Sequence, residues 1–77
     1  MEAKMVDVTL HLGEDTVHEQ REDLRDRLLQ ARGIMAADYH DEKPHLMVVE
    51  YNPDVISSGE ILAIAKQGGL HAELIGL

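Results

Sequence analysis

Residues 46–61, LMVVEYNPDVISSGEI, contain the pattern of a strand, a turn and the start of a helix. Apolar residues alternate with others over 46–51, which is typical of a half-buried strand, and the expected inward-facing residues are Met47, Val49 and Tyr51. Pro53 favours a turn after this strand. Ser57 stands three residues before Glu60, the spacing of a capping box, so a helix is expected to start after Ser57.

The chain after Ser57 continues with a helix and a final strand. Gly68-Gly69 should end the helix, and residues 70–75 alternate again as a strand does. The inward-facing residues are expected to be Ile61, Ile64 and Ala65 in the helix and Leu70, Ala72 and Leu74 in the strand. His71 and Glu73 should then face outward.

The amino-terminal part shows the same two patterns. Residues 5–12 alternate as a strand that ends at Gly13. Thr16 stands three residues before Glu19, a second capping-box spacing, which predicts a helix that begins at Val17 and ends at Gly33. The buried stripe of this helix is expected to contain Val17, Leu24, Leu28 and Ala31.

Residues 34–41 and 46–51 should form a hairpin, with a turn at Lys43-Pro44 and with Ala37 and Tyr39 inward. A four-residue loop would place His40 opposite His45. That register conflicts with the apolar pattern, because opposed residues share one face of a sheet. The apolar pattern therefore predicts a three-residue loop or a bulge.

This order of elements predicts one domain over residues 1–77 with an α+β, ferredoxin-like βαββαβ fold. Its four-stranded antiparallel sheet should have the order 4-1-3-2, with two helices on one face. The other face would be open, with Leu46 and Val48 exposed, and the second strand would be a free edge. Two exposed apolar residues are within the normal range for a monomer, so the chain is expected to be a monomer or a weak homodimer.

The composition limits the function classes. The chain has 77 residues, no cysteine and a formal net charge of −8, with 15 acidic and 7 basic residues. Such a charge repels nucleic acid, and base-stacking aromatics interleaved with Lys or Arg are missing. It suits cations or a basic protein partner, or it serves solubility alone. No stretch reads as a signal peptide or a membrane span, so a cytoplasmic location is expected.

Several motifs together resemble the heavy-metal-associated (HMA) domain family, which comprises small copper chaperones and the matching modules of metal-transporting ATPases. They are Gly33-Ile34, Val48-Val49-Glu50-Tyr51-Asn52-Pro53, the Ser-capped helix after Ser57 and Gly69-Leu70. The family's metal motif is Met-Thr-Cys-x-x-Cys, and this chain has Asp15-Thr16-Val17-His18-Glu19-Gln20 there. Val17 and Gln20 stand in place of the two cysteines, so the soft thiolate site that suits Cu(I) is missing.

Five histidines are expected at the pole of the fold where the family holds its metal. Chain direction places His11, His18 and His71 there, and it places His40 and His45 in the adjacent hairpin, together with acidic residues such as Glu14 and Asp15. Imidazole and carboxylate ligands suit a divalent transition metal, namely Zn(II), Ni(II) or Cu(II). The other interpretation is that each histidine is an ordinary surface residue.

Two functions follow from these patterns. The first is a small non-enzymatic protein of metal homeostasis that binds a divalent metal or docks on a metal transporter. The alternative is a cysteine-less HMA-like scaffold that acts as a protein-interaction or regulatory module without metal. An enzyme is not expected, because serine occurs only at Ser57 and Ser58 and there is no thiol to act as a nucleophile.

Overall fold

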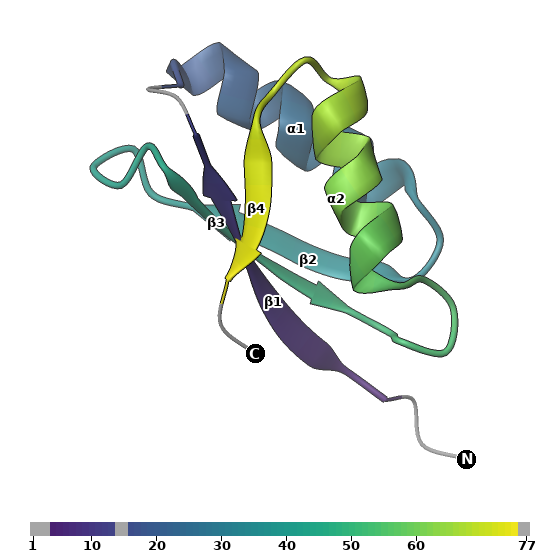
Figure 1. The fold of residues 1–77 in the computed structure, drawn as a ribbon. Helices are drawn as coiled ribbons and strands as arrows, with labels where there is room; N and C mark the ends of the chain where they lie inside the picture. The colour runs from purple at the N-terminus through teal and green to yellow at the C-terminus, as the bar shows by residue number, and fades with distance from the viewer. Residues whose placement is uncertain (1–3, 14–15, 76–77) are drawn as a thin grey trace.

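The computed structural model describes residues 4–13 and 16–75. Six elements follow one another in the expected order: β1 (Val6–Leu12), α1 (His18–Gln30), β2 (Ile34–Tyr39), β3 (Leu46–Tyr51), α2 (Ser58–Gln67) and β4 (Ala72–Ile75). The strands form one antiparallel sheet in the order β2-β3-β1-β4, which confirms the predicted ferredoxin-like arrangement. Figure 1 shows α1 and α2 on the same side of this sheet. Within the described ranges, no helix is long and apolar enough to cross a membrane.

The core lies between the sheet and the two helices. Its fully buried larger side chains are Val8, Leu10, Leu12, Leu24, Leu28, Met47, Val49 and Ile61. Burying one such side chain stabilises a fold by roughly 1.5–3 kcal/mol. The predicted inward residues of β3 are all buried, and Ala65 and Leu70 are buried as expected. Because both helices lie on one side of the sheet, its other face is not covered by helices, and we call it the open face (Figure 1).

The hairpin of β2 and β3 confirms the predicted facing but not the predicted loop. Tyr39 pairs with Met47 and Ala37 with Val49, so the apolar residues do share a face. The loop that connects the two strands spans residues 40–45 and is longer than the predicted three-residue loop. The register shift between β2 and β3 lies at the other end of β2, between Ile34 and Ala36. β2 ends at Tyr39, before the predicted residue 41. The reason is that the carboxylate of Asp41 is held by side chains of α1.

The start of α1 differs from the expected one. The helix begins at His18, and the N-cap residue is Val17, whose N–H donates to Gln20 Oε1 at 2.8 Å. Thr16 does not cap the helix, because its hydroxyl is bonded elsewhere. Val17 is 55% exposed, so its predicted burial was wrong. The position one turn further along the same stripe is occupied by Arg21, which is buried.

Both boundaries of α2 agree with their sequence signals, whereas α1 ends at Gln30 with an extended C-cap at Ala31, three residues before the predicted Gly33. Ser57 Oγ accepts the N–H of Glu60 at 3.1 Å, which confirms the second predicted cap. Gly33 has a φ of 92°, and a Cβ there would come within 2.9 Å of Val55 and Ile56. Only glycine combines that left-handed backbone with such a close approach, so Gly33 fixes the turn from α1 into β2.

Candidate functional site

Three segments meet at one end of the sheet, where the histidines were predicted. The N–H of Leu12 donates to the carbonyl of His45 at 2.7 Å, and the N–H of Gly13 donates to the carbonyl of His71 at 2.7 Å. These bonds join the end of β1 to the 40–45 loop and to the chain entering β4. The first turn of α1 lies at the same end (Figure 1). We call this end the histidine pole.

A buried guanidinium occupies the α1 side of the histidine pole. Arg21 is only 4% exposed. Its Nη1 donates to the carbonyl and to Oγ1 of Thr16, the latter at 2.8 Å, and its Nη2 donates to Asp41 Oδ1 at 2.8 Å. The guanidinium carbon also lies 5.7 Å from the ring centroid of Tyr39, a cation–π contact. A buried charge is stable only when it is paired in this way.

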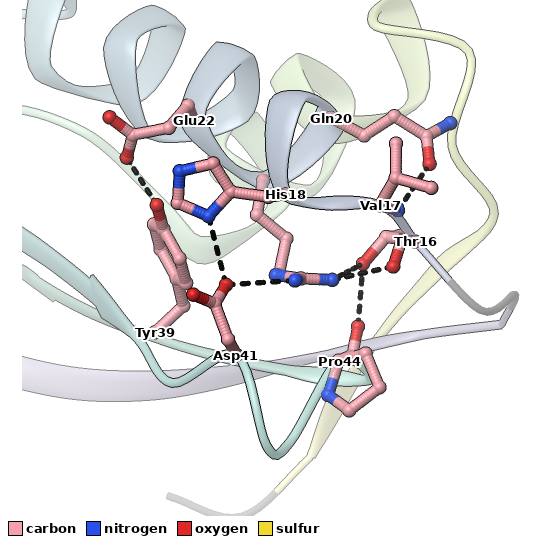
Figure 2. A network of polar contacts seen from close by, with 9 residues as sticks. Thr16, Val17, His18, Gln20, Glu22, Tyr39, Asp41 and Pro44 are labelled. Carbon is pink, nitrogen blue, oxygen red and sulfur yellow. Dashed lines mark hydrogen bonds and ion pairs between the residues drawn. The ribbon is translucent and has the colours of Figure 1, made fainter.

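Thr16 links this guanidinium to the hairpin. Its hydroxyl accepts from Arg21 and donates to the carbonyl of Pro44 at 2.8 Å (Figure 2). The segment entering α1 is therefore tied to the 40–45 loop both by Thr16 and, through Arg21, by Asp41. We call Thr16, Arg21 and Asp41 the Arg21 cluster. It holds together two loops that are about 25 residues apart in sequence.

Two further polar contacts surround the Arg21 cluster (Figure 2). His18 Nδ1 lies 2.9 Å from Asp41 Oδ1, and this hydrogen bond raises the pKa of His18 above its ordinary value. The same bond, followed by the one from Arg21, lowers the pKa of Asp41. The hydroxyl of Tyr39 donates to Glu22, which raises the pKa of Tyr39 to about 12. Asp41 thus stays ionised over the physiological range and serves as the anion for both His18 and Arg21.

The two positions of the missing cysteines do not fit a soft metal. Val17 is an exposed apolar N-cap residue, and the amide of Gln20 is engaged by the backbone of Val17. Cu(I) prefers thiolate or thioether ligands, and neither side chain supplies one. Next to Gln20 stands the buried positive charge of Arg21, which repels a cation. The segment from Val17 to Gln20 therefore offers no site for a soft metal ion.

The structure separates the predicted histidines into groups. The ring of His11 stacks on that of His45, with centroids 5.9 Å apart and planes 15° apart. His11 and His71 line one hollow together with Glu73. His18 instead contacts Asp41 and the edge of the Tyr39 ring. His40 lies exposed in the 40–45 loop.

These contacts bear on the predicted ligand set. Within residues 4–13 and 16–75, no three His, Asp or Glu side chains are grouped so as to hold a metal ion. Glu14 and Asp15, which were expected at this end, lie outside the described residues. His11 and His71 remain a pair on one hollow, whereas the described contacts of His18 link it to neither. The prediction of a histidine site stays a prediction.

Arg21 is the residue that the sequence interpretation overlooked. It lies four residues after Val17 and three before Leu24, on the stripe assigned to the core. Its charge argued against burial, because arginine is almost never fully buried unless it is paired. The available signal was the spacing itself, together with Thr16, which is the only residue retained from the family's metal motif.

Several solved structures have the same arrangement of elements as this chain. Oxidised MerP from Ralstonia metallidurans CH34 superposes with a TM-score of 0.85 over 95% of this chain and 100% of that chain, at 15% identity. The N-terminal domain of a potential copper-translocating P-type ATPase from Bacillus subtilis, in its Cu(I)-loaded state, gives 0.83 over 95% and 90%, at 19% identity. The chain has the fold of an HMA domain.

A third solved structure is the apo HMA domain of a copper chaperone for superoxide dismutase, with a TM-score of 0.77 over 99% of this chain and 72% of that chain, at 18% identity. No family model matches the sequence, and no curated protein matches it. The resemblance predicted from the sequence is thus confirmed at the level of the HMA fold.

Proposed function

We propose that this HMA-fold chain is a non-enzymatic accessory of metal handling, which docks on a protein partner instead of carrying a soft metal ion. The Arg21 cluster carries this proposal. Its buried cation and its hydrogen bonds, which join the start of α1 to the 40–45 loop, occupy the end of the fold where the family's motif would bind metal. Hydrogen bonds of this kind favour a rigid scaffold for docking over an open ligand loop.

The partner of this proposed function is a protein of the metal-transport machinery, in the cytoplasm. The P-type ATPase domain and the copper chaperone among the structural neighbours support that choice by their names. The net charge of −8 favours a basic partner. Docking between charged surfaces raises the association rate and weakens as salt rises.

Crosslinking in cells that make the chain tests this function. With and without a membrane-permeant Cu(I) chelator, we expect the same partner, identified by mass spectrometry as a metal-transport or metal-handling protein. Its purified domain should also bind the purified chain. A chaperone of the same fold with its cysteines intact is the matched control. A partner lost in chelator, or no metal-handling protein above background, would contradict the proposal.

The histidine pair supports a second candidate function, the binding of a divalent metal. His11 and His71 line the same hollow with Glu73, and His11 stacks on His45, so imidazole and carboxylate groups gather on one side of the pole. Zn(II), Ni(II) or Cu(II) would suit such ligands. His18 would contribute only if its imidazole left its present contact with Asp41.

Titration of the three metals, followed by imidazole NMR signals, tests this candidate. We expect shifts of His11 and His71 that are lost in the H11Q/H71Q variant, kept in the H40Q control and weaker below about pH 6.5, where free imidazole protonates. Unchanged histidine signals at millimolar metal would remove the candidate and leave the docking function as it stands.

A further inference from the structure

We propose that the open face of the sheet docks a basic segment of a partner protein, in which lysine or arginine side chains flank an apolar one. This inference rests on the proposed docking function and names its surface and partner chemistry. It places the contact on the strands and away from the Arg21 cluster.

The strand register defines the open face as three cross-strand rows. Directly paired residues share a face, and most of the alternate residues of the four strands are buried or partly buried in the core on the helix side. The rows are Ala36–Glu50–Asp7, Asp38–Val48–Thr9–Ile75 and Leu46–His11–Glu73. The middle row crosses all four strands, so a segment lying on it would contact the whole width of the sheet.

The charge of the open face has one sign. None of the four strands contains a lysine or an arginine, whereas the open face carries Asp7, Asp38, Glu50 and Glu73. The ion pairs found between described residues involve none of these four carboxylates. The lysines and arginines that lie in regular elements belong to α1 and α2, in the opposite layer. A basic ligand would thus meet no like charge on the strands.

One pair on this face is itself unfavourable without a cation. Asp7 and Glu50 are direct partners across β1 and β3. Like charges directly opposite each other destabilise a sheet, and the described residues supply no basic side chain to separate them. A lysine or arginine of a partner placed between Asp7 and Glu50 would attract both carboxylates and so offset their mutual repulsion.

The middle row provides the apolar part of the surface. Val48 is 42% exposed and Ile75 is 41% exposed, with Thr9 paired to both. Carboxylates lie in the rows on either side, so the pattern is apolar at the centre and acidic at the rim, as in protein interfaces that bury an apolar core. A second copy of this chain does not fit, because two such acidic faces repel each other.

A synthetic peptide of alternating lysine and valine, blocked at both ends, probes this surface. Titrated into isotope-labelled protein, it should shift amide signals of β1 and β3, with an affinity that falls as salt rises. The Asp7→Asn/Glu50→Gln variant should bind about fivefold more weakly. Its melting temperature should nevertheless rise, because the like-charged pair is gone. That combination distinguishes a binding role from simple loss of structure.

The matched control is Glu19→Gln/Asp26→Asn, which removes two exposed charges from α1. Its affinity for the peptide should equal that of the original chain. Equal weakening in both variants, shifts confined to the helices, binding of the same peptide with glutamate in place of lysine, or no shift at millimolar peptide would each overturn this inference. The docking function itself would then still be decided by the crosslinking experiment.

Discussion

Replacing Val17 and Gln20 together by cysteine should convert this chain into a Cu(I)-binding protein. Both side chains are exposed at the start of α1, so thiols there need not disturb the core. Two thiolates with Cu(I) carry a net negative charge, which the helix N-terminus and the nearby Arg21 guanidinium would stabilise. In the original chain neither position supplies a thiolate, so the guanidinium has no metal–thiolate anion to stabilise there.

The expected gain can be estimated from metal-site energetics. A four-ligand structural zinc site contributes about 10–16 kcal/mol. Two thiolates are half of such a ligand set, so we take half of the lower value, about 5 kcal/mol. This free energy corresponds to an affinity for Cu(I) that is more than about a thousandfold higher than that of the original chain. Competition against a coloured Cu(I) chelator under reducing conditions measures this affinity.

The Val17→Ser/Gln20→Ser variant is the control, because serine is similar in size to cysteine but supplies no soft ligand. If the folded cysteine variant competes no better than the serine variant, Val17 and Gln20 do not correspond to the metal positions of the HMA fold. That result would also remove the reason for linking the Arg21 cluster to loss of metal binding.

Most of the fold could be predicted because its signals are local. Alternation over β3 and the Ser57 cap depend on residues close in sequence, and both were confirmed. The strand order could be predicted as well, because right-handed crossovers leave few ways to pair four such strands, and it was confirmed.

The misassigned features depend on contacts between distant segments. Thr16 has the spacing of a cap, yet its hydroxyl bonds to Pro44, 28 residues away. The length of the 40–45 loop is likewise tied to Asp41, which leaves the sheet to meet Arg21. No pattern within either segment shows that the other is near. The histidines illustrate the same limit: topology brings them to one end, but only coordinates separate the His11–His45 stack from His18.

Replacing Arg21 by methionine should lower the free energy of unfolding by about 2–3 kcal/mol. A buried ion pair replaced as a whole by apolar residues is often neutral or stabilising. Here only the cation is removed. The carbonyl and hydroxyl of Thr16 would lose their donor, whereas Asp41, whose side chain is 62% exposed, would be rehydrated. The loss is therefore expected to come from Thr16 and from the untied 40–45 loop.

For a domain of this size, that loss corresponds to a fall in melting temperature of about 10–20 °C. Arg32→Met is the matched control, because Arg32 is exposed and the change in charge is the same, and its effect should stay within about 0.5 kcal/mol. Arg21→Lys should fall between the two, since an ammonium cannot reproduce the planar fork that reaches Thr16 and Asp41 at once.

Amide hydrogen exchange distinguishes a local cause from a general one. In Arg21→Met, the N–H groups of the 40–45 loop and of Leu12, which donates to that loop, should exchange faster than those of α2 after correction for global stability. A methionine variant as stable as the Arg32 control, with unchanged exchange in the loop, would mean that the buried guanidinium does not hold the pole together. The proposal of a rigid docking scaffold would then lose its physical basis.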